Sequence, residues 1–369
     1  MSNVSLSDLH LTTLPEATLS PHRYDIDWLR TLALGLLIVY HVVMSFQPWG
    51  YLFGFPQNEQ SLVNLWIPMA LINVWRIPIL FAISGMGVWF ALKRRSWQQL
   101  LQDRALRILL PFGFGIFFIN PIVAYAAMIY YDTDPYYLPG QFHLWFLGNI
   151  FVYVLLLLPM LMAIKKWPDN AVLGWLRLLV QLPGGILLFA LPLMVEAWLV
   201  NPADFVTYAE TAHGFWLGLV CFLTGFLFVS LQDTFWHALT EVRALAAAFA
   251  LIMYLVRLFH FQFQGVPNGL IALESMLWML AILGFGAIYL NRPSRALGYL
   301  STAVYPVYIV HMPVQFLLAL VILPLPLAAV LKLLLLLAGT LGASLLLYEV
   351  LLKRIRWIRP LFGMKTTPR

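Results

Sequence analysis

Ten apolar segments, each roughly as long as a membrane is thick, dominate this sequence. A helix needs about 20 apolar residues to cross the hydrocarbon core. The segments that approach or exceed this length are 29–49, 62–92, 105–131, 143–164, 184–201, 212–231, 239–261, 269–290, 297–322 and 327–352. Only 10% of the residues are charged, whereas soluble domains carry about 25%. The sequence therefore predicts an all-α, polytopic membrane protein with about ten transmembrane helices.

The other segments complete a simple organisation. Residues 1–26 are polar and lack the apolar core of a signal peptide, so we expect a cytoplasmic N-terminal arm. Residues 27–355 form one membrane domain, and residues 356–369 form a basic cytoplasmic tail. Between residues 168 and 185, Pro and Gly residues bracket a short amphipathic stretch, which is typical of a helix lying in the membrane interface. The single cysteine, Cys221, excludes an internal disulfide and a thiolate metal cluster.

The basic residues predict how the chain is oriented. With this layout, 19 of the 22 Lys and Arg residues fall on one side of the membrane: Arg23, Arg30, Lys93, Arg94, Arg95, Arg104, Arg107, Lys165, Lys166, Arg177, Arg243, Arg292, Arg295, Lys353, Arg354, Arg356, Arg359, Lys365 and Arg369. The opposite connections carry mainly acidic residues: Glu59, Asp132, Asp134, Asp204 and Glu210. The positive-inside rule then places both termini in the cytoplasm. This placement of charge also argues against nucleic acid as a partner, despite the net charge of +6.

A polar stripe follows the first apolar segment. Arg30 and His41 are eleven residues apart, so a helix places them on one face about 16 Å apart along the axis. Asp27 lies one turn before Arg30, and Ser45 one turn beyond His41. Such a stripe can serve only to join helices, through hydrogen bonds between their polar side chains. Ionisable residues inside a membrane more often mark a cavity or a pathway, which favours a functional site.

A second group of charges precedes the third segment. Arg104 and Arg107 are one helical turn apart, and two guanidinium groups on one face suit the binding of phosphates. The alternative is a positive-inside connection that binds anionic lipid headgroups, which we favour for Lys93, Arg94 and Arg95.

Several further polar residues lie in or near apolar segments. Arg76 needs a carboxylate partner or water, and Glu274 and Glu196 are candidates. His143 stands beside Trp145 at the start of a segment. Tyr308 and His311 are three residues apart and can meet on one helix face. Near the end of the last apolar segment, Glu349 is expected to pair with Arg30 or with the basic tail.

Several of these fragments together resemble the acyltransferase-3 family of membrane O-acyltransferases, in particular its glucan-modifying, succinyltransferase-like branch. The fragments are RYDIDWLRTLALGLLIVYH with Arg-x10-His, ILFAISG, RALR as Arg-x-x-Arg before Pro111, FHLWFL and VYPVYIVHMPV. They occur in the family's order over roughly residues 23 to 355.

The resemblance implies transfer of an acyl group from cytoplasmic acyl-CoA, such as acetyl- or succinyl-CoA, to a hydroxyl of an extracytoplasmic glycan or glycolipid. It implies a multi-pass protein of the bacterial inner membrane. In this interpretation His41 is the base, since imidazole can accept a proton near neutral pH. Arg30, Arg104 and Arg107 hold the anionic donor. The resemblance leaves open direct transfer or an acyl-enzyme.

Two rival functions remain at this point. A transporter or flippase for a lipid-linked sugar would also place charges in a cavity, although the sequence shows no clear inverted repeat. A non-catalytic partner in glycan assembly would not need Arg30 and His41 on one face. Nucleotide-binding loops, HExxH and GxSxG motifs are absent, and the carboxylates form no metal-ligand cluster in the sequence. No resident metal or cofactor is therefore expected.

Overall fold

The computed structural model describes residues 22–365, and every regular element in this part of the chain is helical. The α-helices are α1 (Tyr24–Met44), α2 (Trp66–Arg94), α3 (Trp97–Arg104), α4 (Leu110–Phe114), α5 (Asn120–Tyr130), α6 (Trp145–Lys166), α7 (Ala171–Gln181), α8 (Ala190–Val200), α9 (Ala212–Ser230), α10 (Asp233–Phe259), α11 (Asn268–Tyr289), α12 (Arg295–Ile322) and α13 (Ala329–Leu347). Three π-helical turns cover Ala105–Leu109, Gly115–Ile119 and Tyr348–Leu352. Short 3-10 turns cover Gly50–Phe53, Val63–Leu65, Phe142–Leu144, Gly185–Phe189 and Arg359–Phe362.

Within residues 22–365, nine helical stretches are long and apolar enough to cross a membrane. They coincide with nine of the ten predicted segments, which confirms the all-α, multi-pass class. The third predicted segment is one continuous stretch, Trp97–Tyr130, in which α3, α4 and α5 are joined by π turns. Pro111 lies just after the first π turn, and because it has no N–H it leaves one carbonyl of that turn without its helical partner.

The remaining predicted segment, 184–201, is shorter than the others. It forms the apolar helical stretch Gly185–Val200, and at about 1.5 Å per residue such a stretch falls short of a full membrane crossing. Its end lies beside the start of α11, because Asn268 Nδ2 donates to the carbonyl of Pro202 at 2.9 Å. The count of ten crossings and the cytoplasmic position of both termini stay predictions.

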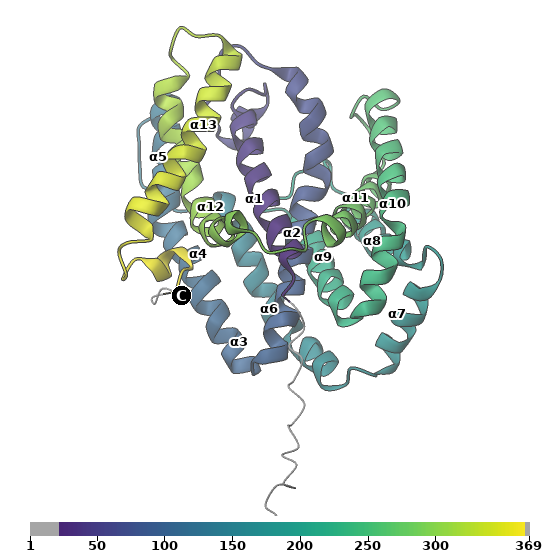
Figure 1. Ribbon diagram of the computed structural model, residues 1–369. Helices are drawn as coiled ribbons and strands as arrows, with labels where there is room; N and C mark the ends of the chain where they lie inside the picture. The colour runs from purple at the N-terminus through teal and green to yellow at the C-terminus, as the bar shows by residue number, and fades with distance from the viewer. Residues whose placement is uncertain (1–21, 366–369) are drawn as a thin grey trace, which may run out of the picture.

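The predicted amphipathic helix corresponds to α7. Asn170 begins it, since its side chain accepts from the backbone N–H of Leu173 at 3.0 Å. Its apolar residues point both ways: Leu173, Leu176 and Val180 are buried, whereas Val172, Trp175 and Leu178 are exposed. In Figure 1 it lies at the lower edge of the bundle. An exposed apolar face at this edge fits a helix in the membrane interface.

Helix α2 forms the centre of the bundle through its close contact with α9. A Cβ atom on Gly85 would lie 1.9 Å from the carbonyl oxygen of Phe222, and one on Gly225 would lie 2.0 Å from that of Ala82. Only glycine permits this approach of two backbones. Gly85 therefore allows the close packing of α2 on α9.

The predicted boundaries of the arm and the tail do not match the elements. Most of the predicted arm, 1–26, lies outside the described residues, but α1 already begins at Tyr24. The described part of the predicted tail packs on the bundle, with the ring of Phe362 at 5.6 Å from that of Phe114. Of the two partners predicted for Glu349, the basic C-terminal cluster is correct, since Glu349 pairs with Lys353 at 3.0 Å.

The two ends of the bundle carry different side chains. One end of the bundle contains Arg30, the C-terminus of α2 and helix α3, and we call it the basic end. The opposite end contains the start of α2 and the Gly50–Phe53 turn, because α2 runs the length of the bundle from Trp66 to Arg94 (Figure 1).

Candidate active site

Two of the predicted histidines meet inside the bundle. His41 of α1 and His311 of α12 stack with ring centroids 5.2 Å apart and planes 2° apart. Their nitrogens are in hydrogen-bond contact, with His41 Nδ1 at 2.9 Å from His311 Nε2. His311 is fully buried. The structure thus joins two predicted residues that are 270 positions apart in the chain.

The contacts assign one tautomer to each ring when both imidazoles are neutral. His311 Nδ1 lies 2.6 Å from the carbonyl oxygen of Tyr308, so Nδ1 carries the proton and donates it. His311 Nε2 then has a lone pair and accepts from His41 Nδ1–H. The remaining nitrogen of His41, Nε2, is therefore left with a free lone pair. This is the state that a general base requires.

A third histidine completes the group. The ring of His143 stands edge-on to that of His311, with centroids 5.1 Å apart. His143 Nε2 donates to the carbonyl of Ile309 at 3.2 Å, and its buried Nδ1 has no partner in the described part of the chain. A cavity of about 30 Å³ lies between His41, His143 and Tyr308. This volume suffices for a water-sized group, since one water needs about 10–15 Å³.

Proline explains why the carbonyl of Ile309 is available. In a helix this carbonyl would accept from the N–H of residue 313, but Pro313 has no N–H. His143 uses the free acceptor. The Tyr-x-x-His-x-Pro fragment is thus one unit, in which Tyr308 fixes His311 and Pro313 frees the carbonyl for His143.

Further contacts of α12 hold the site together. Gln315 Nε2 donates to the carbonyl of His41 at 2.8 Å, and the hydroxyl of Tyr308 donates to the carbonyl of His143 at 2.5 Å. The hydroxyl of Tyr305 donates to the carbonyl of Arg107, in the first π turn, at 2.8 Å. Neither Gln315 nor Tyr305 was predicted as a site residue, although each lies about one helical turn from His311 or Tyr308.

The predicted polar stripe of α1 is only partly connected. Arg30 Nη2 contacts Asp27 Oδ1 at 2.8 Å, as expected from their spacing. Ser45 does not reach the histidines, and its buried hydroxyl has no partner among the described residues. The stripe therefore consists of an ion pair at the basic end and His41 deeper in the bundle.

The arginines of the basic end form a cluster around one carboxylate. Asp103 accepts from Arg95 at 2.8 Å and from Arg107 at 2.9 Å. Arg104 makes only a long contact of 3.5 Å to the carbonyl of Gly87, and its Nε has no partner in the described chain. Arg30 is close enough to Arg104 for electrostatic repulsion. The cluster keeps an excess of positive charge, and it includes Arg95, which the sequence had not grouped with Arg104 and Arg107.

Arg76 has neither of its two candidate partners. Glu274 pairs with Arg257 at 2.6 Å, and Glu196 pairs with His213 at 2.9 Å. Both glutamates therefore lie in other buried pairs, which the sequence could not distinguish. Arg76 is only 2% exposed.

The actual neighbours of Arg76 are uncharged. Its guanidinium stacks on Tyr40, with Cζ 3.9 Å from the ring centroid, and donates to Asn73 Oδ1 at 2.9 Å. Two of its nitrogens, Nε and Nη1, have no partner in the described structure. Tyr40 also lies 5.8 Å from His41, measured between ring centroids. The sequence did not identify Tyr40 and Asn73 as neighbours of Arg76; it offered only their positions, next to His41 and three residues before Arg76.

Three imidazoles in contact also raise the question of a metal. Residues 22–365 contain no group of His, Cys, Asp and Glu side chains arranged to hold a metal ion. The histidines meet through stacking and hydrogen bonds instead.

Comparison with protein families matches residues 23–349 to the acyltransferase domain of the acyltransferase-3 family. The chain belongs to this family. The match covers the arginine cluster and all three histidines of this acyltransferase-3 protein. No curated protein and no solved structure matches it. Family membership favours a membrane acyltransferase over a transporter or a non-catalytic partner.

Proposed function

We propose that this acyltransferase-3 protein moves an acyl group from cytoplasmic acyl-CoA to a hydroxyl of an extracytoplasmic glycan or glycolipid, in the bacterial inner membrane. The single observation that carries the proposal is the chain of contacts from the Tyr308 carbonyl through His311 to His41. This chain leaves His41 Nε2 with a free lone pair beside a small cavity. Acyl transfer to a hydroxyl needs such a proton acceptor.

The donor approaches from the basic end in this proposal. CoA is anionic, and Arg104 has unused N–H groups in a cluster of positive charge. Arg30 lies about 16 Å below His41 along α1, by the rise of a helix. The long pantetheine arm suits this separation, with the phosphates at the arginines and the thioester near His41.

The reaction itself is a direct transfer. His41 Nε2 takes the proton of the acceptor hydroxyl while its oxygen attacks the thioester carbonyl. The carbon–sulfur bond breaks, the thiolate of CoA leaves, and it takes the proton from His41. Direct attack is supported by the surroundings of His41, since no Ser, Thr or Cys side chain hydrogen-bonds with it in the described residues.

The test is thiol release by purified protein in lipid nanodiscs. Acetyl-CoA and succinyl-CoA are offered with gluco-oligosaccharides, and the acylated product is detected by mass spectrometry. General-base assistance is worth about 100- to 10,000-fold in rate, so H41Q should lower turnover by at least about 100-fold.

His237 provides the matched control because its side chain is 76% exposed. H237Q should retain wild-type turnover. Wild-type-like turnover of H41Q, or transport of saccharide without any thiol release, would overturn the proposed function.

A further inference from the structure

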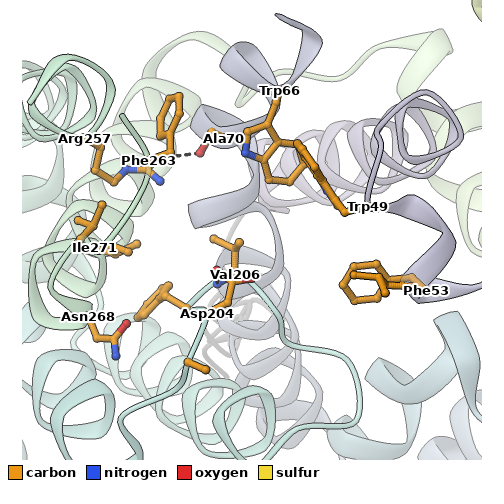
Figure 2. Close-up of a pocket in the computed structure, with 15 residues that line it drawn as sticks. Trp49, Phe53, Trp66, Ala70, Asp204, Val206, Arg257, Phe263, Asn268 and Ile271 are labelled. Carbon is orange, nitrogen blue, oxygen red and sulfur yellow. Dashed lines mark hydrogen bonds between the residues drawn. The ribbon is translucent and has the colours of Figure 1, made fainter. Parts of the chain in front are cut away.

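A second, larger cavity lies at the end of the bundle opposite the arginine cluster. It has a volume of about 400 Å³, within the range of about 300–1,000 Å³ that is usual for small-molecule sites. Figure 2 shows Trp49 and Trp66 on one side, Arg257, Phe263 and Ile271 on the other, and Asp204 below. The cavity is built from the connections at this end, between α1 and α2, α8 and α9, and α10 and α11.

The groups around the cavity combine flat aromatic faces with exposed polar atoms. Trp49 and Trp66 pack edge to face, with ring centroids 5.0 Å apart. Asp204 is exposed and accepts from the hydroxyl of Thr207 at 2.5 Å. Asn268 also lines the cavity; its Nδ2 donates to Asn201 and Pro202, which leaves its amide oxygen as the acceptor for a sugar hydroxyl. Aromatic faces cover the C–H face of a sugar ring, and carboxylate and amide groups bind its hydroxyls. A lipid chain would not need these polar groups, so the lining favours a sugar.

The opposite wall is held rigidly. Arg257 is 4% exposed and bonds with both Glu274, at 2.6 Å, and the carbonyl of Ala70, at 2.9 Å. Gln262 and Phe263 adopt positive φ angles of 49° and 62°, which is unfavourable for side chains other than glycine. This conformation brings Phe263 over Arg257, with Cζ 5.5 Å from the ring centroid. Such local strain is typical of ligand-binding segments.

A series of rings connects this cavity to the histidines. Trp66 lies 6.3 Å from Tyr40, and Tyr40 lies 5.8 Å from His41, between ring centroids. The cavity and the proposed base are thus separated by one aromatic side chain.

We propose that this cavity is a saccharide subsite, in which Trp49 and Trp66 stack on a sugar ring and Asp204 and Asn268 bind its hydroxyls. The proposal rests on the proposed function, because the subsite would hold the acceptor glycan next to the hydroxyl that is acylated. It adds the residues that recognise the acceptor and its chemical class, a neutral sugar chain.

Binding without a donor tests the subsite separately from the reaction. Neutral gluco-oligosaccharides are titrated into full-length protein in nanodiscs, by calorimetry, without acyl-CoA. An aromatic contact contributes about 0.5–1.5 kcal/mol beyond burial, so W66A should weaken binding by up to about tenfold. D204N should also weaken it, and W66F should restore most of the affinity.

Two controls match these variants. W198A removes an indole that is 75% exposed on α8, and D134N removes an exposed carboxylate of another connection. Both should bind like wild type, and all variants should show wild-type size-exclusion profiles.

The outcomes separate the two proposals. Unchanged binding by W66A and D204N, or no saccharide binding by wild-type protein, would overturn the subsite even if His41-dependent transfer is observed. Binding that depends on Trp66 and Asp204 supports the subsite, even if no thiol release is ever detected and the proposed function fails.

Discussion

At the residue scale, we expect His311 to hold the tautomer of His41. The variant H311F keeps a ring of similar shape but removes the nitrogen that accepts from His41 Nδ1. Removing a hydrogen-bond partner that orients a functional imidazole typically costs about 10- to 100-fold in activity. We therefore expect kcat to fall by this factor with little change in KM for the donor, measured by thiol release.

The variant H260F is the control, since His260 is exposed. Unchanged kcat for H311F, or an equal loss of kcat for H260F, would contradict the positioning role.

Arg76 carries a second prediction at this scale. A buried guanidinium without an acidic partner destabilises the fold, and replacing buried charges by apolar side chains is often neutral or stabilising by about 1–4 kcal/mol. We expect R76M to unfold at the same or a higher temperature than wild type. We also expect it to lose most of its turnover, because two N–H groups of Arg76 have no partner in the described structure and its guanidinium lies on Tyr40, the neighbour of His41, where it suits a developing oxyanion.

Thermal unfolding in detergent and thiol release measure the two effects. A variant R76M that is both less stable and fully active would show that Arg76 serves packing only.

At the scale of elements, the contact of α2 with α9 depends on glycine. In G85A the new Cβ would lie 1.9 Å from the carbonyl oxygen of Phe222, so the helices must separate. Overpacking of this kind costs about 1–3 kcal/mol. The melting temperature of G85A should fall clearly below that of wild type.

Gly87 lies on the same helix but has open space around it, because an added Cβ would meet no atom within 4 Å. G87A should therefore melt at or slightly above the wild-type temperature, because alanine is the better helix former. Similar melting temperatures of the two variants would contradict the close contact.

At the scale of the whole molecule, the distribution of charge predicts orientation. Cys221 is fully buried and should not react, so introduced cysteines report their own exposure. An impermeant maleimide added to intact cells with a permeabilised outer membrane should label D134C and leave R94C unlabelled until the inner membrane is opened. Labelling of R94C from outside would reverse the orientation and place the arginine cluster away from cytoplasmic CoA.

The sequence predicted the helices and placed Asp27 one turn from Arg30, with which it forms an ion pair, because both features depend on neighbours within one or two turns. It also placed Tyr308 beside His311. It could not predict that His41 meets His311, since that contact depends on how α1 packs on α12. The partners predicted for Arg76 were wrong for the same reason, because the two candidate glutamates pair with His213 and Arg257 in the folded protein. The free carbonyl of Ile309 was predictable in principle from Pro313 alone.

The anchor of His311 is a backbone carbonyl, and this has a consequence for the lifetime of a protonated His41. Among residues 22–365, no carboxylate hydrogen-bonds with His41, His143 or His311. A protonated His41 would thus have no counter-charge and would pass its proton on at once. In the proposed reaction the departing thiolate is the base that takes this proton. We expect proton uptake and proton release at His41 to be closely coupled, so that the imidazolium does not accumulate during turnover.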